Sequence, residues 1–424
     1  MRVFLGLTEI AGYYANLRLG LAELGIDTLY IDLSLHSFRY SGTGDIHPLV
    51  RIIHFSVAQR TSGNIGRRLF WKSLDMLARS VLLIWAIVTC DVFIFGFHTS
   101  FFSYVELPLL KLLGKRVIYV FHGSDVRPAY LDGSLMAQDR GRTTAKCIRL
   151  TRHQALKLRV TDYFADVIVS HPPFAHFHRR RFVPFLRIGL PYAITTPPSG
   201  SPPEAQNRPI RVLHSPSHPE AKGTPEIREA IRRLQAKGHP VELVELTGVT
   251  NAVVLADLAR CDFVVDQVYS DTPMAGFATE AAHFGKPTVV GGYAQEVARL
   301  GLPDELVPPS IYCRPEELES SIERMITDVE YRLALGRAAQ AFVLREWSPQ
   351  AVAARFVRII RDEVPADWLV DPNEIHYLYG GGLSITRARE LVRAILAAGG
   401  PRALQLRHRP DLERQMVAFA RERD

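Results

Sequence analysis

Residues 262–292, DFVVDQVYSDTPMAGFATEAAHFGKPTVVGG, predict a strand, a loop, a short helix and a second strand. The β-branched run at 263–265 indicates a strand buried on both faces, and 288–290 indicates the next strand. Between them, the apolar residues 276–284 predict a helix. Gly285 and the proline two residues later predict where this helix ends. This order is typical of open α/β sheets, which bind ligands in a crevice at the carboxyl ends of their strands.

The predicted helix at 276–284 carries one acidic residue, Glu280. A carboxylate near the start of such a helix faces the ligand crevice, where it can accept hydrogen bonds from sugar or ribose hydroxyls. The alternative is an acid that only favours the positive end of the helix dipole. Both interpretations stay open from these residues alone.

Length and charge limit the class of protein. The 424 residues are enough for two domains, and 51 basic against 44 acidic residues give a net charge of +7. This modest excess suits phosphate-bearing ligands, an anionic membrane surface or nucleic acid, and selects none of them. Four widely spaced cysteines without metal spacing, and a start too short for a signal peptide, predict a cytoplasmic protein. Peripheral attachment to the inner membrane face remains an option.

The N-terminal half alternates predicted strands and helices, which indicates a doubly wound parallel sheet. The expected strands are 3–7, 28–31, 92–95, 116–121 and 166–169. Gly12, after the first strand, either lets a substrate approach the backbone or only forms a turn, and it belongs to no GxGxxG. The missing fingerprint argues against a two-domain NAD enzyme. Residues 69–88 are apolar but interrupted by charges, so they predict a buried helix and not a membrane span.

A polar loop, HGSDVRP, follows the strand predicted at 116–121. His122 can polarise or deprotonate a bound hydroxyl there, and Asp125 can orient it or bind an acceptor. Alternatively, Ser124 and Asp125 cap a turn and His122 is an ordinary loop residue. The place of this loop at the functional end of a strand favours the site.

The proline-rich segment 195–209 predicts a linker, after which the strand–helix pattern restarts at 210–214. The next loop, HSPSHPEAKGT, leads into a helix N-terminus and contains Lys222. Free amides and a lysine suit a diphosphate, although the glycine spacing of a Walker loop is missing. The alternative is an ordinary loop with a solvated lysine.

Residues 215–218, 222–224, 266–267 and 276–287 resemble the nucleotide-sugar half of GT-B glycosyltransferases, closest to the retaining group-1 (family 4-like) type. The resemblance covers about 1–365 and is specific only within 214–292. It implies two Rossmann-like doubly wound α/β domains that face a cleft, here 1–194 on the acceptor side and 210–346 on the nucleotide-sugar side. It also implies a crossover helix at 347–365, which leaves 366–424 as a helical C-terminal extension.

The same resemblance suggests roles for individual residues. The family's diphosphate-binding lysine corresponds to Lys222, its ribose-binding glutamate to Glu280, and its sugar-contacting histidine to His122. Two positions depart from the family: Thr272, beside Asp271, stands where a second glutamate is usual, so the retaining or inverting outcome stays open. Ser217, beside His218, stands where an arginine is usual. The full candidate set is catalytic His122 and Asp125, with donor-binding Gly12, Ser217, His218, Lys222, Gly223, Thr272, Gly276 and Glu280.

The resemblance implies a metal-independent, hexosyltransferase-like enzyme without a cofactor, acting in polysaccharide or glycoconjugate synthesis. Its partners are a nucleoside-diphosphate sugar donor and a hydroxyl acceptor, either free or lipid-linked, and no nucleic acid is expected. The alternative, motivated by Thr272 and Ser217, is a non-catalytic nucleotide-sugar-binding or assembly protein.

Two further segments carry expectations. The sequence at 377–383, YLYGGGL, predicts a flexible hinge. The histidines and arginines at 176–181 lack convincing metal partners and predict a basic surface loop. Because phenylalanines flank that loop, we expect it to contact anionic lipid together with the basic helix around 149–159. The alternative is that these arginines are only solvated.

Overall fold

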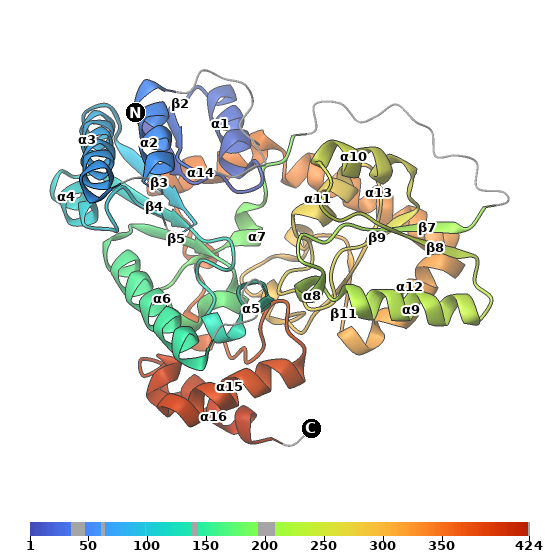
Figure 1. Cartoon of the computed structure of the whole chain (residues 1–424). Helices are drawn as coiled ribbons and strands as arrows, with labels where there is room; N and C mark the ends of the chain where they lie inside the picture. Colours follow the sequence, from blue (N-terminus) through green and yellow to red (C-terminus); the bar gives the residue numbers. More distant parts are fainter. Residues whose placement is uncertain (35–46, 61–63, 98, 138–142, 194–207, 423–424) are drawn as a thin grey trace.

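A computed structural model describes residues 1–34, 47–60, 64–97, 99–137, 143–193 and 208–422 (Figure 1). It contains two entirely parallel sheets, one of six strands and one of five. The predicted α/β class with two helix-covered parallel sheets and a helical extension is therefore confirmed. The expected linker lies outside the described residues except for its last two positions.

The N-terminal sheet has the order β2-β1-β3-β4-β5-β6. Its strands are β1 (Arg2–Leu7), β2 (Asp27–Asp32), β3 (Val92–Gly96), β4 (Arg116–Val120), β5 (Val167–Ser170) and β6 (Val183–Pro184). Its helices are α1 (Tyr13–Glu23), α2 (Pro48–Gln59), α3 (Ile65–Thr89), α4 (Glu106–Leu112), α5 (Gly133–Ala137), α6 (Thr144–Phe164) and α7 (Phe185–Ile188). Strand β2 lies on one side of β1 and β3 lies on the other, so the strand order reverses between β1 and β3.

The C-terminal sheet has the order β11-β10-β9-β7-β8, with its reversal between β7 and β9. Its strands are β7 (Ile210–His214), β8 (Val241–Glu245), β9 (Phe263–Val265), β10 (Thr288–Gly291) and β11 (Ile311–Cys313). Its helices are α8 (Pro219–Lys222), α9 (Thr224–Ala236), α10 (Asn251–Arg260), α11 (Gly276–His283), α12 (Leu318–Thr327) and α13 (Val329–Glu346). Phe263, Val264 and Val265 are all fully buried, as expected of a central parallel strand.

The chain then returns to the N-terminal half. Helix α14 (Pro349–Ile360) packs against α1 so closely that a side chain at Gly20 would overlap the backbone of Pro349. Helices α15 (Ile385–Gly399) and α16 (Pro410–Arg421) lie beside α6 (Figure 1). Leu404, Met416 and Phe419 belong to the same buried cluster as the N-terminal strands. The C-terminal extension therefore completes the core of the first half.

The glycine-rich segment 377–383 is not the flexible hinge that its composition predicts. The Gly133 amide donates to the Gly381 carbonyl at 2.8 Å, and the Gly382 amide donates to the Tyr269 carbonyl at 2.6 Å. A side chain at Gly381 would meet the guanidinium of Arg127 at 2.6 Å. These glycines are needed for close backbone approach, because the segment is wedged between the two halves.

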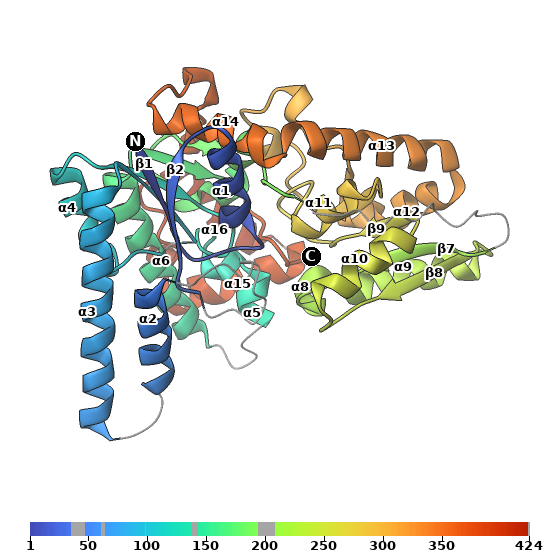
Figure 2. The same cartoon turned by 90° about the horizontal axis from the view of Figure 1, so that it is seen from above.

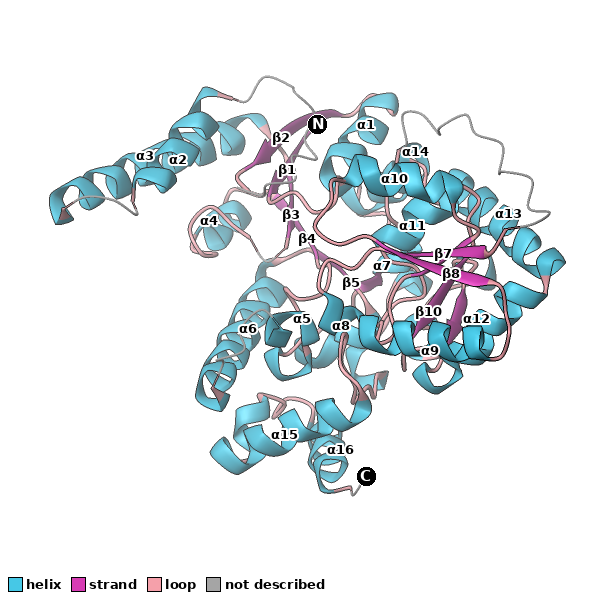
Figure 3. Ribbon diagram, turned by 45° about the vertical axis from the view of Figure 1, so that its right-hand side comes forward, coloured by secondary structure: helices cyan, strands magenta, loops and turns pink. Residues whose placement is uncertain are grey.

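The expectation of a buried helix at 69–88 is wrong for one of its faces. Helix α3 buries only one side, which includes Asp75, Ala78, Leu82 and Ala86. With α2 it forms a hairpin that projects from the body (Figures 2 and 3). An apolar run by itself predicts a core helix, because hydropathy does not show whether another element covers each face.

The predicted lipid-binding loop at 176–181 is also wrong, because the aromatic residues on which it depended are buried. Phe177, Phe182 and Phe185 expose 3% or less of their surface. His178 is fully buried and bonds to Asp162 through Nδ1 and to Ser170 through Nε2, both at 3.0 Å. The exposed arginines contact the protein itself: Arg180, for example, donates to the Ala165 carbonyl at 2.6 Å, at the end of α6.

Candidate functional site

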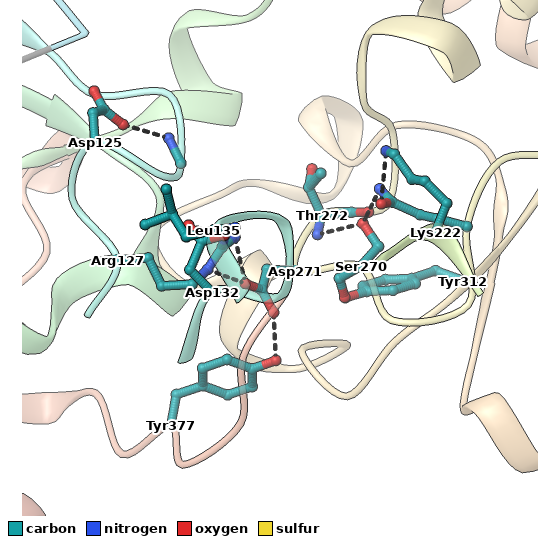
Figure 4. Close-up of polar contacts among 12 residues, drawn as sticks. Asp125, Arg127, Asp132, Leu135, Lys222, Ser270, Asp271, Thr272, Tyr312 and Tyr377 are labelled. Atoms are coloured by element: carbon teal, nitrogen blue, oxygen red, sulfur yellow. Dashed lines mark hydrogen bonds and ion pairs between the residues drawn. The ribbon is translucent and has the colours of Figure 1, made fainter. Parts of the chain in front are cut away.

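The carboxyl ends of the two sheets meet through a buried ion pair (Figure 4). Arg127 follows β4, Asp271 follows β9, and Arg127 Nη2 lies 2.7 Å from Asp271 Oδ2. A second carboxylate, Asp132, lies 3.3 Å from Arg127 Nη1. The loops in which sequence analysis places the candidate residues are thus held against one another by charge.

The C-terminal extension completes this network. Tyr377 donates its hydroxyl to Asp271 Oδ1 at 2.6 Å, so both carboxylate oxygens of Asp271 are engaged by the protein. Burial raises the pKa of the Asp271 carboxyl above its ordinary value, although Arg127 and Tyr377 oppose that rise. In the sequence, Asp271 stands out only as a neighbour of Thr272, and no pattern points to Arg127 or Tyr377.

On the N-terminal side, the structure brings Gly12 and His122 to one place. Gly12 has φ +81°, a conformation that favours glycine, at the start of α1. The two following residues, Tyr13 and Tyr14, both contact the His122 ring, and Tyr14 Oη is 3.0 Å from His122 Nε2. Burial lowers the pKa of His122 to about 3, so the imidazole stays neutral at physiological pH and resists protonation.

Glu9 is a residue of this loop that sequence analysis missed. Its carboxylate accepts from the amides of Tyr14 at 3.2 Å and Ala15 at 2.9 Å, and from the Tyr30 hydroxyl at 2.8 Å. It therefore satisfies the amides at the N-terminus of α1 and fixes the loop around Gly12. An acid three residues before a loop glycine was the available signal.

Asp125 does not contact the His122 imidazole. Its carboxylate accepts from the backbone amides of His122 at 3.0 Å and Gly123 at 2.7 Å. The residue thus holds the shape of the loop that carries His122. Burial raises the pKa of the Asp125 carboxyl to about 6, although these amide contacts lower it.

This raised pKa gives a pH prediction for the variant Asp125→Asn. Below about pH 6 the folded state keeps a proton on Asp125 that the unfolded chain, with the ordinary value of 3.8, has already lost. The free energy of unfolding of wild type should therefore rise, relative to that of the variant, as pH falls from neutral through about 6. Urea denaturation of both proteins across this range measures the difference. Parallel pH profiles would contradict the assignment.

On the C-terminal side, Lys222 lies at the reversal of strand order between β7 and β9. Its Nζ donates to Gln267 Oε1 at 2.8 Å and lies 3.9 Å from Asp266 Oδ1. Asp266 is 2% exposed, and its Oδ2 has no hydrogen-bond partner among the described residues. The lysine side chain keeps 23% of its surface exposed, so it can reach a ligand at this edge.

The loop around Lys222 is a single helical turn followed by a longer helix. Gly223, with φ +74°, joins α8 to α9, and a side chain there would overlap Val268 at 2.5 Å. His218 precedes α8 and accepts the Lys222 amide through its carbonyl at 3.0 Å, while Ser217 is exposed. The buried His214 fixes the base of the loop, with Nδ1 2.8 Å from the Val265 carbonyl and Nε2 2.8 Å from Thr224 Oγ1.

Glu280 lies on α11, as predicted, and is partly buried. Its Oε1 accepts from the Tyr192 hydroxyl at 2.7 Å and from Asn251 Nδ2 at 2.9 Å. Burial raises its pKa above the ordinary value, and the nearby Asp266 charge adds to the rise. One carboxylate oxygen of Glu280 is thus engaged by the protein, and Asp266 interacts electrostatically with Glu280 and lies 3.9 Å from Lys222.

The remaining donor-side candidates differ in their surroundings. Gly276, at the start of α11, has no heavy atom within 4 Å of the place where a Cβ would stand, so its face is open. Thr272 bonds through its backbone to Ser270 Oγ, and its own Oγ1 is buried without a partner among the described residues. Within those residues, no group of three His, Cys, Asp or Glu side chains is arranged to hold a metal ion.

No family model and no curated protein matches the sequence. Among solved structures, the catalytic domain of starch synthase IV from Arabidopsis thaliana, bound to ADP and acarbose, gives a TM-score of 0.51 at 11% identity, over 85% of this chain and 98% of that one. HepE from Anabaena, in complex with UDP-glucose, gives a TM-score of 0.47 at 11% identity, over 85% of this chain and 99% of that one. WaaG, a glycosyltransferase involved in lipopolysaccharide biosynthesis, gives a TM-score of 0.47 at 13% identity, over 85% of this chain and 99% of that one. At these identities the likeness concerns the fold alone.

Proposed function

Taking as premise the GT-B fold that the chain shares with the starch synthase domain, we propose that the protein transfers a sugar from a nucleoside-diphosphate donor to a hydroxyl acceptor. The starch synthase domain is bound to ADP, which is consistent with a nucleoside diphosphate on the C-terminal side. The family resemblance of 214–292 supports a hexosyl donor and a place in polysaccharide or glycoconjugate synthesis.

One observation carries this proposal most directly. Lys222 from the loop after β7 and Gln267 from the loop after β9 are joined across the reversal of strand order, with 2.8 Å between Nζ and Oε1. In open α/β sheets this is the position of the ligand crevice. A phosphate there would accept from the lysine ammonium, and Glu280 on α11 would accept from the ribose hydroxyls.

These side chains are suited to stabilising the diphosphate as it leaves the donor sugar. As the bond between sugar and phosphate breaks, negative charge grows on the diphosphate, and the Lys222 ammonium stabilises it without a bound metal. His122, kept neutral by burial, lies on the opposite half. Because its Nε2 is 3.0 Å from Tyr14 Oη, a hydrogen bond to the donor sugar or the acceptor hydroxyl would be made through Nδ1. We assign Asp125 to positioning the His122 loop, because its oxygens accept from the amides of that loop.

A second candidate function is nucleotide-sugar binding without transfer. It is favoured by Asp271, whose carboxylate is engaged by Arg127 and Tyr377 and is not free to contact a donor sugar. Turnover with a panel of UDP-, ADP- and GDP-sugars, followed by mass spectrometry of products, separates the two functions. Donor binding with neither transfer nor hydrolysis would favour the second.

Glu280→Gln tests the nucleoside side of the site. The glutamine oxygen can still accept from Tyr192 and Asn251, so the fold should be kept while the charge is lost. Because hydrogen bonds to a charged group are stronger by about 1 kcal/mol than neutral ones, we expect about fivefold weaker binding of the nucleoside diphosphate by calorimetry. Glu330→Gln, at an exposed acid of α13, is the control. Equal affinities would show that Glu280 does not bind the nucleoside and only favours the positive end of the helix dipole.

A further inference from the structure

The α2–α3 hairpin leaves a long apolar face uncovered within the described part of the chain. Along α3, Leu69, Phe70, Leu77, Val81, Ile84 and Val88 each expose between 44% and 76% of their surface. Leu77, Val81, Ile84 and Val88 follow one another at steps of three or four residues, which places them on one side of the helix. Exposed apolar rows of this length mark interaction surfaces in monomeric proteins.

Aromatic side chains continue this face towards the projecting end of the hairpin. Phe55 of α2 and Phe70 of α3 both pack edge-on against Trp71, each with ring centroids 5.1 Å apart. Phe55 still exposes 54% of its surface and Phe70 exposes 60%. Phenylalanine and leucine side chains on one face of a helix that also carries basic residues are typical of helices that lie in the membrane interface.

The charge of the hairpin is almost entirely positive. Residues 48–89 contain six arginines and lysines and one acid, Asp75. Asp75 is 4% exposed and bonded to Arg60 and Arg79, so its charge is compensated inside the hairpin. Arg67, Arg68 and Lys72 remain exposed beside the apolar face. With six basic residues and one acid, the hairpin carries a net charge of +5.

These features distinguish between possible occupants. A second copy of the chain would bring the same positive charges to the contact with no exposed acid of the hairpin to pair with them, so like charges would oppose association. Nucleic acid would match the charge but not the apolar row. An anionic lipid surface matches both. None of the described helices is long and apolar enough to cross a membrane.

We propose that the α2–α3 hairpin is a membrane-docking element, which lies flat on an anionic leaflet with the outer face of α3 among the headgroups and upper acyl chains. Arg67, Arg68 and Lys72 then contact lipid phosphates. The hairpin belongs to the half that carries Gly12 and His122, so docking would bring that half to the leaflet. The inference does not depend on the proposed sugar transfer, since attachment is measured without turnover.

Co-sedimentation of the full-length protein with phosphatidylglycerol-containing and pure phosphatidylcholine vesicles tests the proposal. Wild type should bind the anionic vesicles at low salt, leave them at high salt, and bind neutral vesicles weakly. The triple variant Phe70→Ser, Leu77→Ser, Ile84→Ser should reduce partitioning by about tenfold or more, because its side chains no longer enter the leaflet. The variant Arg67→Gln, Arg68→Gln, Lys72→Gln should lose the preference for anionic lipid.

Two control variants make equal changes elsewhere on the chain. Val329→Ser, Leu333→Ser, Leu344→Ser removes three exposed apolar side chains from α13, and Arg228→Gln, Arg232→Gln, Arg233→Gln removes three exposed charges from α9. Both should bind vesicles like wild type. The proposal is overturned if wild type ignores anionic vesicles, or if the α3 and α13 serine variants behave alike. It is also overturned if light scattering shows a dimer that only the α3 serine variant dissociates.

Discussion

Arg127→Met is expected to lower the free energy of unfolding by about 3–5 kcal/mol, because it leaves two buried carboxylates without their cation. Asp132 lies at Nη1 of the guanidinium and Asp271 at Nη2, and neither exposes more than 1% of its side chain. A carboxylate in such a place must either stay charged at high cost or bind a proton. Chemical denaturation of wild type and variant measures the difference.

A double variant gives this experiment an internal control. Adding Asp271→Asn to Arg127→Met removes one of the uncompensated charges, so part of the lost stability should return. Arg228→Ala breaks an exposed pair with Glu245 on the surface of the C-terminal half, and it should change stability little. If Arg127→Met unfolds at the same denaturant concentration as wild type, the ion pair does not hold the two halves together.

Lys222→Ala is expected to weaken nucleoside diphosphate binding by about tenfold or more, since charge-assisted hydrogen bonds contribute roughly 1.5–3 kcal/mol. The Lys222 ammonium bonds to Gln267 Oε1 at 2.8 Å and lies 3.9 Å from Asp266 Oδ1. Titration calorimetry with UDP, ADP and GDP measures the loss for each base.

The matched control for this experiment is Lys237→Ala. Lys237 follows α9 in the same half and pairs with Glu319 at 2.8 Å on the protein surface. It should leave affinity unchanged. The Lys222 variant should also show a shallower dependence of affinity on salt, because one charge no longer contributes to phosphate binding. Equal affinities for wild type and Lys222→Ala would remove the diphosphate site from this loop.

Helices and strands whose bounds depend on neighbouring residues were predictable from the sequence. The strand at Phe263–Val265 and the helix at Gly276–His283 lie within a residue of the expected bounds, because β-branched residues and Gly285 act on their immediate neighbours. The loops of His122 and Lys222 were also predictable. Each follows a predicted strand, and parallel sheets gather such loops at one edge.

Contacts between distant residues were not predictable. Arg127 and Asp271 are 144 positions apart, and Asp271 and Tyr377 are 106 apart, so no periodicity or turn signal connects them. The glycines at 380–382 have a composition typical of flexible segments, and only the neighbouring backbones show that they fill a tight space. The same reason explains why the phenylalanines at 177 and 182 were expected at the surface: their cover comes from elements elsewhere in the chain.

The first half of the protein is completed by residues 385–421, and this affects how it can fold during synthesis. Tyr130 donates to the Leu404 carbonyl at 3.2 Å, and it shares one buried cluster with Met416 and Phe419. On a translating ribosome these partners emerge after the whole second half has been made. Until then the apolar surface around Tyr130 stays open to water and to neighbouring chains, which favours aggregation. The N-terminal half therefore cannot complete this part of its core before residues 404–419 have left the ribosome.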